Sequence, residues 1–452
     1  MPTASAVHPA DARRLLAQGS FYSGALQLSN ASAVLPLICA ELASVWVAGL
    51  LYPLFCIGLI GGYTISPWLL GRARHLKHLT FSGGTVAMAA LIAGAAIAAK
   101  HTWYIESIFI VAAAGLGVAK GVSDGAHAEL VAARLPQQRR GDLLLCEGAV
   151  SAVIVTAATL LVVPLLSSGS FGGGHAAVLW LGAIGMVAAA ASALRGGPVH
   201  AHAGAPVLPL RHLVSHGFGA IRTHRWFRRH LVVRLLFVPI GLAELFYSLH
   251  ACTENRDTTS RVALALVCIS AGVLIGSYLW RAVYRAAGVR GMLLWSSMIA
   301  VATAAVCGLG HLAGLWPQTW LCGLVILLSA VANTAVWAGV VEWLGMLAAE
   351  HERATLMGVG MVAAAAATAL MGLVIGAIAP VTGALWPVTI LLILNMIAVI
   401  AATSAPDHIA GGAAVRKPSE GIQHVGESSH DDRAAAARAM SAVKACAQVF
   451  PA

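Results

Sequence analysis

Residues 45–77 show the pattern on which the rest of the chain is built: they read VWVAGLLYPLFCIGLIGGYTISPWLL and then GRARHLK. No charged side chain occurs in 45–70, and Arg72, Arg74 and Lys77 follow immediately. About 20 predominantly apolar residues make a helix long enough to cross the hydrocarbon of a bilayer. The stretch therefore predicts a membrane-spanning helix that ends in a basic loop.

The composition indicates that the whole chain follows this pattern. Of its 452 residues, 59% are hydrophobic and 10% are charged, whereas soluble domains carry roughly 25% charged residues. These values exclude an ordinary soluble protein, a collagen-like chain and a disulfide-rich secreted protein. Long unbroken apolar runs also argue against an outer-membrane barrel, whose strands are short and alternate in polarity.

Twelve apolar runs of membrane-spanning length account for most of the sequence. They lie at about 19–43, 45–70, 81–99, 105–128, 143–167, 175–194, 231–251, 261–281, 291–313, 319–346, 355–380 and 385–404. Polar residues interrupt the first run, which is also longer than the roughly 7 to 15 apolar residues of a cleavable signal. We therefore expect an all-α membrane protein with twelve transmembrane helices.

Basic residues in alternate loops predict the orientation. One set of connections carries most of them, including Arg13, Arg14, Arg72, Arg74, Lys77, Arg134, Arg139, Arg140, Arg195 and Arg222, and the opposite set has little beyond Lys100, Arg256 and Arg261. Because basic loops stay on the cytoplasmic side, this asymmetry predicts that both termini are cytoplasmic. It also accounts for the formal charge of +10, from 28 Lys and Arg against 18 Asp and Glu, without a nucleic-acid partner.

The spans fall into two sets of six. We expect an N-terminal bundle over 1–194, a cytoplasmic linker with a surface helix over 195–230, a C-terminal bundle over 231–404, and a largely disordered cytoplasmic tail over 405–452. Setting Arg140 against Arg353 also sets Glu129 against Glu342, which indicates a weak repeat of the two halves. A parallel repeat of six spans is typical of one class of secondary transporters.

Three segments resemble the major facilitator superfamily. The family's first helix is similar to Phe21-Tyr-Ser-Gly-Ala-Leu26 with Val34-Leu-Pro-Leu37 and Glu41-Leu42. Its loop between spans ten and eleven is similar to Glu350-His-Glu-Arg-Ala-Thr-Leu-Met-Gly358. Its entry to span seven is similar to Trp226-Phe-Arg-Arg-His-Leu231. The resemblance covers about 15–404. It implies two six-helix bundles, with spans one, four, seven and ten lining a solute pathway and spans two, eight and eleven flanking its gates.

The chain departs from the family's motifs at two places. Only Gly71-Arg-Ala-Arg74 resembles the basic cluster that many members carry between spans two and three. Span five, from Leu143 to Ser167, lacks the Gly-Pro pair of the proton-driven drug antiporters. Both departures argue against a standard multidrug exporter.

Charged side chains inside a predicted span are functional candidates, because a bilayer tolerates them only when they pair or face water. Lys120, Asp124 and His127 in span four are spaced so that they share one helical face. The functional hypothesis is that Lys120 neutralises an anionic cargo and that Asp124 exchanges a proton. The alternative is a self-satisfied local ion pair.

Span seven supplies a second set of candidates. Glu244 and Tyr247 lie three residues apart and face the same way. If Glu244 faces an apolar cavity, the protonated form of its carboxyl is favoured, as proton coupling requires; the alternative is a solvated group at the outer interface. Arg234, close to the cytoplasmic entry of this span, is expected to anchor to lipid headgroups.

Polar and aromatic side chains in spans one and ten complete the predicted pathway. Gln27 and Asn30 are neighbours on a face of span one, with Tyr22 about two turns below, and Asn333 and Trp337 form a comparable pair in span ten. These residues would supply hydrogen bonds and a stacking surface to a solute. Ordinary interhelical hydrogen bonding is the structural alternative.

The inner ends of spans four and ten carry candidate gate residues. They are Glu129, Arg134, Arg140, Glu342 and Arg353. A salt-bridge network that forms in one conformation and breaks in the other would suit alternating access. A solvated loop edge is the alternative.

Pairs of glycines four residues apart indicate close helix packing. They are Gly58 and Gly62, Gly272 and Gly276, and Gly372 and Gly376. The missing side chains allow backbones to approach each other within a membrane.

Neither a metal site nor a cofactor is expected. The eight cysteines form no CxxC pair, and the histidines of the linker have no accompanying carboxylate or cysteine. Metal sites in proteins need such sets of ligands.

The sequence thus predicts a secondary active transporter of a small organic solute that works by alternating access, with proton coupling as a hypothesis. We expect no enzymatic activity, a monomer, a location in the plasma membrane, and no partners beyond the solute, protons and the lipid bilayer. One alternative is a transporter-like assembly or sensor protein without transport. Another is a polytopic enzyme of envelope synthesis, which the short outer loops and the lack of a nucleotide-binding glycine loop disfavour.

Overall fold

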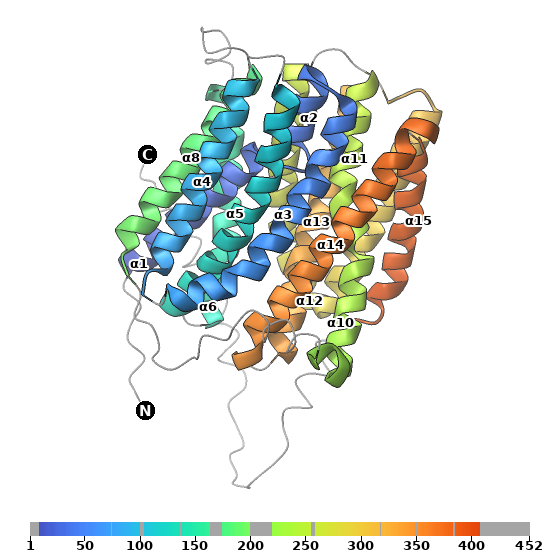
Figure 1. Cartoon of the computed structure of the whole chain (residues 1–452). Helices are drawn as coiled ribbons and strands as arrows, with labels where there is room; N and C mark the ends of the chain where they lie inside the picture. Colours follow the sequence, from blue (N-terminus) through green and yellow to red (C-terminus); the bar gives the residue numbers. More distant parts are fainter. Residues whose placement is uncertain are drawn as a thin grey trace. The chain divides into compact units, whose positions relative to one another are not determined.

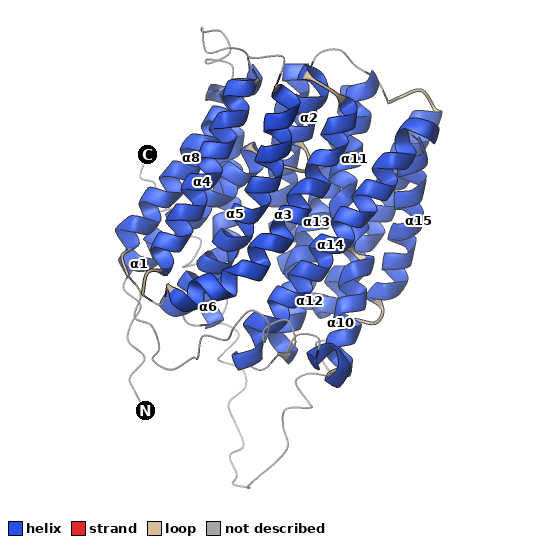
Figure 2. Ribbon diagram, in the orientation of Figure 1, coloured by secondary structure: helices blue, strands red, loops and turns tan. Residues whose placement is uncertain are grey.

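The computed structural model describes ten stretches of the chain. They are residues 9–73, 75–99, 104–135, 137–162, 174–198, 219–254, 258–316, 318–348, 350–382 and 385–406. All of them belong to one compact unit, Met1–His408. Every regular element in these stretches is a helix, as Figure 2 shows.

The helices follow one another as the apolar runs predict. The first half contains α1 (Pro9–Leu28), α2 (Val34–Leu42), α3 (Val45–Arg72), α4 (Lys77–Ala98), α5 (Ile105–Arg134), α6 (Gln137–Ala157), η1 (Ala158–Val162) and α8 (Gly174–Gly196). The second half contains α10 (Arg225–Leu236), α11 (Val238–Glu254), α12 (Thr258–Leu312), α13 (Thr319–Leu347), α14 (Glu350–Thr382) and α15 (Leu385–Ala402). Figure 1 shows these helices running alongside one another as a bundle.

Nine helices in the described stretches are long and apolar enough to cross a membrane. One of them, Val262–Leu312 within α12, has 51 residues. A straight helix of that length would extend over roughly 75 Å, which is more than twice the roughly 30 Å of a bilayer's hydrocarbon. Gly288 divides α12 with a backbone φ of 64° and ψ of −163°. The helical membrane architecture is confirmed, while the number of crossings stays a prediction.

Two of the predicted spans are each built from two helices. The run at 19–43 consists of α1 and α2, which non-helical residues around Asn30 separate. The seventh run consists of α10 and α11, which meet at Phe237, two residues before Pro239 in the sequence. The helix begins at Arg225 rather than at the expected 231. The helix of this seventh span therefore extends six residues further toward the N-terminus than the sequence suggests.

Apolar side chains cover the outside of the bundle, while small polar ones lie inside. Leu161, Leu370 and Ile400 are 65%, 66% and 72% exposed, respectively, whereas Ser123 and Thr85 are fully buried. Soluble proteins rarely expose so much large apolar surface. The arrangement fits a lipid environment, in which the hydrocarbon chains contact the outward-facing side chains.

Glycines bring α3 and α5 into backbone contact. A Cβ atom on Gly58 would meet the carbonyl oxygen of Ala114, and one on Gly62 would meet that of Val118. On the facing helix, a Cβ on Gly117 would meet the carbonyl oxygen of Phe55. The predicted close approach at the first glycine pair is therefore confirmed.

The other two predicted glycine pairs give a mixed result. A Cβ on Gly272 would lie 2.7 Å from the carbonyl oxygen of Leu327 in α13, and one on Gly276 would lie 3.3 Å from Cβ of Thr334. A Cβ on Gly372 would lie 3.1 Å from Cγ of Pro53, which belongs to the other half of the chain. A Cβ on Gly376 would meet no described atom within 4 Å, so the prediction of a close approach is wrong for this residue.

Several predictions fall on parts of the chain outside the described residues. The tail beyond 406 lies there, as does the middle of the predicted linker, 199–218, with most of its predicted surface helix. Of that surface helix only the end is described, and residues 219–223 are helical. The side chains of Arg140 and Arg353 also lie outside the described part, although both residues belong to helices.

The contact between α3 and α5 gives a first test. Gly117→Val would press two methyl groups against the backbone of α3, and overpacking typically costs about 1–3 kcal/mol. We expect a lower midpoint of thermal unfolding for the detergent-purified protein. The control is Gly83→Val, because nothing lies within 4 Å of a Cβ atom at that position of α4. Equal midpoints for the two variants would contradict the described packing.

Candidate functional site

A carboxylate of α5 forms the centre of a polar cluster in the first half of the chain. The hydroxyl of Tyr22 donates a hydrogen bond of 2.7 Å to Oδ1 of Asp124. The hydroxyl of Tyr63 donates one of 2.7 Å to Oδ2, and Nζ of Lys120 lies 2.5 Å from the same oxygen. We call these four residues the Asp124 cluster; they come from α1, α3 and α5.

The Asp124 cluster has no net charge when both ionic groups are charged. Lys120 and Asp124 lie one helical turn apart, so their side chains meet on the same face, as the sequence predicts. Their side chains are 25% and 20% exposed, respectively. The geometry fits both the functional hypothesis and the structural ion pair. Tyr63 was not predicted, because a tyrosine in an apolar run carries no sequence signal of its partner.

His127 belongs to a second polar group, on the other side of Tyr22. Its Nε2 lies 3.3 Å from Oε2 of Glu147, and its Nδ1 lies 3.4 Å from Nε2 of Gln18. The ring of Tyr22 lies beside the imidazole, with 6.2 Å between centroids. Glu147 is 3% exposed. Glu147 was not predicted, although an acidic residue inside the apolar run at 143–167 is a usable signal.

The break between α1 and α2 places Asn30 at the boundary between the two halves of the chain. Its Nδ2 donates a hydrogen bond of 3.0 Å to Oε1 of Glu244 in α11. Its Oδ1 accepts hydrogen bonds from the backbone nitrogen of Ser32, at 2.8 Å, and from the Ser32 hydroxyl, at 2.7 Å. These local bonds compete with helix continuation and fix the amide. Glu244 is 6% exposed.

Gln27 makes a second polar link between the halves. Its Nε2 donates to Oγ of Ser151 in α6, at 3.1 Å, and its Oε1 accepts from Oγ of Ser270 in α12, at 3.3 Å. Asn30 and Gln27 therefore lie where the first half meets α11 and α12. Both residues were predicted to line the pathway; the structure brings Asn30 to Glu244 and Gln27 to Ser151 and Ser270.

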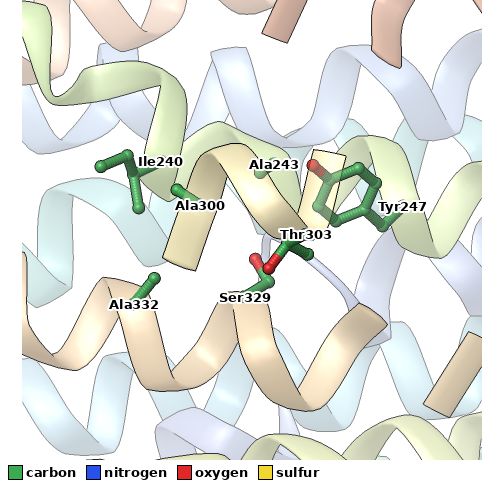
Figure 3. Close-up of a pocket in the computed structure, with 7 residues that line it drawn as sticks. All are labelled: Ile240, Ala243, Tyr247, Ala300, Thr303, Ser329 and Ala332. Atoms are coloured by element: carbon green, nitrogen blue, oxygen red, sulfur yellow. The ribbon is translucent and has the colours of Figure 1, made fainter. Parts of the chain in front are cut away.

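Tyr247 lines a small pocket in the second half of the chain, which Figure 3 shows. The lining residues come from α11, α12 and α13: Ile240, Ala243, Tyr247, Ala300, Thr303, Ser329 and Ala332. Within the described part of the chain, the buried hydroxyls of Tyr247 and Ser329 have no hydrogen-bond partner. Tyr247 thus points away from the Asn30–Glu244 contact, into its own bundle.

The polar and aromatic pair of span ten does not join these groups. A Cβ atom on Gly241 of α11 would lie 3.6 Å from Oδ1 of Asn333, so the amide faces α11. Trp337 is 53% exposed. The structure therefore separates the two residues of the predicted pair.

The predicted gate residues have partners of different kinds. Glu129 forms an ion pair of 2.6 Å with Lys77. Nη2 of Arg134 donates to the carbonyl oxygens of Gly196 and Gly197, at 2.8 Å and 2.7 Å, at the end of α8. Glu342 accepts a hydrogen bond of 3.0 Å from the hydroxyl of Tyr284.

The prediction for Arg234 is wrong. The sequence suggested that its side chain reaches lipid headgroups, but it is only 7% exposed. Its Nη2 lies 2.7 Å from the sulfur of Met361 in α14. The reason is that Arg234 shares a helix face with Phe227 and His230, and this is the face that α10 buries.

No protein-family model matches the chain. Among curated proteins, Uncharacterized protein Rv2209 of Mycobacterium tuberculosis (strain ATCC 25618 / H37Rv) is 39% identical over 398 residues, which is 88% of this chain and 77% of that protein. Uncharacterized protein Mb2232 of Mycobacterium bovis gives the same values.

Solved transporter structures share the fold at low sequence identity. A mutant of the nucleoside transporter NupG has a TM-score of 0.64 and 13% identity and covers 90% of this chain and 100% of its own. An auto-inhibited POT family peptide transporter has a TM-score of 0.61 and 14% identity and covers 93% and 99%. A D-xylose-proton symporter has a TM-score of 0.64 and 11% identity and covers 88% and 98%. The resemblance to the major facilitator superfamily is thereby confirmed for the fold.

The ion pair in the Asp124 cluster yields a second prediction. Asp124→Asn leaves the charge of Lys120 without its partner, and removing one partner of a buried pair costs roughly 3–5 kcal/mol, with partial exposure lowering that figure. We expect a clear drop in the midpoint of thermal unfolding. The double variant Lys120→Met/Asp124→Asn removes both charges and should recover most of the loss.

Glu129→Gln is the matched control, because the Glu129 side chain is 42% exposed and its ion pair with Lys77 is a surface contact. Exposed pairs contribute about 0–1 kcal/mol, so its midpoint should stay near that of the wild type. A double variant that is less stable than Asp124→Asn alone would show that the described ion pair is not the source of the loss.

Proposed function

Because this chain belongs to the family of the mycobacterial proteins Rv2209 and Mb2232 and has the fold of major facilitator superfamily transporters, we propose that it is a secondary active transporter. It carries a small organic solute across the cell membrane by alternating access. The fold alone does not specify this activity, since one fold hosts many functions. The polar groups inside the bundle are what support transport in this chain.

The observation that carries the proposal is the set of polar contacts across the boundary between the halves. Asn30 bonds to Glu244, and Gln27 bonds to Ser270. Each hydrogen bond of this kind has a modest net energy, of roughly 0.5–1.5 kcal/mol. Such contacts hold one arrangement of the halves and still allow another, as rigid-body motion requires.

The proposed transporter crosses the membrane twelve times. In this assignment α12 makes two crossings that meet at Gly288, α1 with α2 makes one, and α6 with η1 makes one. With the basic loops on the inside, both termini are cytoplasmic. The Asn30–Glu244 contact then lies in the outer half of the membrane, and the Asp124 cluster lies nearer the cytoplasm.

Glu244 is the proposed coupling carboxylate between the halves. It is buried and accepts a hydrogen bond from Asn30. Charge-assisted hydrogen bonds are roughly twice as strong as neutral ones, so protonation of Glu244 weakens its bond to the Asn30 amide. Uptake of a proton at Glu244 would therefore make separation of the two halves easier at this point. Asp124 is the second candidate, since it holds Tyr22, Tyr63 and Lys120 together.

The related solved structures give no single cargo. Their descriptions name a nucleoside transporter, a peptide transporter and a D-xylose-proton symporter. The cargo of this chain must therefore be read from its own interior residues.

A flux measurement tests the proposal directly. The purified chain is reconstituted in liposomes, a mixture of bacterial metabolites is added outside, and the accumulated solutes are identified by mass spectrometry. We expect at least one solute to accumulate beyond the level in protein-free liposomes when a proton gradient is imposed. No accumulation in either direction, with other membrane proteins still co-purifying, would contradict transport and favour an assembly or sensor role.

The coupling residues are tested with the transported solute. Glu244→Gln and Asp124→Asn each remove a titratable group, and we expect each variant to lose most of the stimulation of flux by the proton gradient. Glu106→Gln serves as the control, because its carboxylate is exposed in the first turn of α5 and belongs to neither the predicted pathway nor the predicted gates. Full gradient dependence in both Glu244→Gln and Asp124→Asn would remove these two residues from proton coupling.

A further inference from the structure

Arg234 is a buried cation whose contacts do not compensate its charge. It lies in α10 and is 7% exposed. Its one hydrogen bond within the described residues goes from Nη2 to the sulfur of Met361, at 2.7 Å. A thioether is a weak acceptor, and a guanidinium stays protonated in proteins.

The acidic groups near the interior of the bundle are paired with other residues. Asp124 pairs with Lys120, Glu147 with His127, and Glu244 with Asn30. No ion pair to Arg234 occurs in the part of the chain that the structure describes. A buried charge without a partner destabilises a fold, so an arginine of this kind needs another reason to be there.

Space for the guanidinium is built into the neighbouring helix. A Cβ atom at Gly360 of α14 would lie 3.0 Å from Nη1 of Arg234. Any larger residue at 360 would displace the head of the side chain. The pairing of Arg234 with Gly360 therefore holds the charge at a defined position between α10 and α14.

Arg234 lies near the first half of the chain, because α14, which its guanidinium contacts, packs against α3. Tyr63 of α3, whose neutral hydroxyl donates to Asp124, is within electrostatic range of the guanidinium. Since Lys120 already neutralises Asp124, the Asp124 cluster contributes no net charge. The boundary between the Asp124 cluster and Arg234 thus carries one uncompensated positive charge.

We propose that Arg234 binds the anionic group of the solute, a carboxylate or a phosphate, at the boundary between α10, α14 and Tyr63 of the opposite half. A planar guanidinium can donate two parallel hydrogen bonds to such a group. The inference rests on the proposed transport for the solute and deepens it, since it makes the cargo an organic anion. It also assigns the cationic role to Arg234 in place of Lys120, whose charge is already paired.

Thermal unfolding of the full-length chain in uncharged detergent tests this site. The probes are succinate, benzoate and glycerol 3-phosphate, their neutral counterparts succinamide, benzamide and glycerol, and the anionic, neutral and cationic fractions of a bacterial metabolite extract. We expect an anion or the anionic fraction to raise the unfolding midpoint. Arg234→Gln should need a roughly 10- to 100-fold higher concentration of the same probe than the wild type for the same shift. The concentration that Arg234→Lys needs should lie between those for the wild type and Arg234→Gln.

Two further comparisons separate binding from a structural role. Arg228→Gln is the matched control, because Arg228 lies on the same helix and is exposed. Without any probe, Arg234→Gln should be at least as stable as the wild type, because it removes an unpaired buried charge. If Arg234→Gln unfolds at a markedly lower temperature without probe, or responds to anions as the wild type does, the proposal is overturned.

The source of the anion is tested in nanodiscs. The shift of the unfolding midpoint by soluble anions should persist in phosphatidylcholine nanodiscs. Stabilisation by phosphatidylglycerol alone would assign Arg234 to lipid and overturn the solute site. Stabilisation only by the neutral or cationic fractions of the extract would also overturn it.

Flux measurements distinguish the anion site from the proposed transport. Transport of a neutral solute, unaffected by Arg234→Gln, would leave the transporter intact and remove the anion site. Arg234-dependent binding of an anion without any flux would support the anion site and contradict transport.

Discussion

An ionisable side chain inside a bilayer is costly unless another polar group compensates it or it faces water. Three such groups in this bundle are compensated by residues of other helices: Asp124 by Tyr22 and Tyr63, Glu147 by His127, and Glu244 by Asn30. These contacts tie α1, α3, α5, α6 and α11 together at chosen points, whereas apolar packing alone leaves the rotation of a membrane helix weakly determined. The polar groups therefore contribute to the arrangement of the helices as well as to any chemistry.

The polar groups also divide by location in a way that suits transport. The Asp124 cluster and the His127–Glu147 pair lie within the first half, so motion between the halves leaves them intact. Asn30 and Gln27 instead contact α11 and α12 of the second half. Asn30 is available for this because the chain leaves the helix between α1 and α2. In the proposed transport cycle, this break in the helix supplies the contact that forms and breaks.

Much of the fold could be predicted from the sequence, because apolar length and basic loops depend only on local composition. The Lys120–Asp124 pair was also predictable, since helical spacing fixes it. The partners Tyr63 and Glu147 were not identified, because their roles depend on which helices become neighbours. Arg234 was misplaced for a related reason: it lies on the buried face of α10, and which face becomes buried depends on the neighbouring helices.

The central claim is that the two halves move against each other about the Asn30–Glu244 contact. Distances between spin labels measure this most directly, with one pair at Ala43→Cys and Ala313→Cys and another at Ala133→Cys and Arg228→Cys, all of them exposed positions. We predict two distance populations for each pair. Lowering the pH until Glu244 is protonated should increase the distance in the first pair and decrease the distance in the second. A single distance for both pairs under every condition would contradict it.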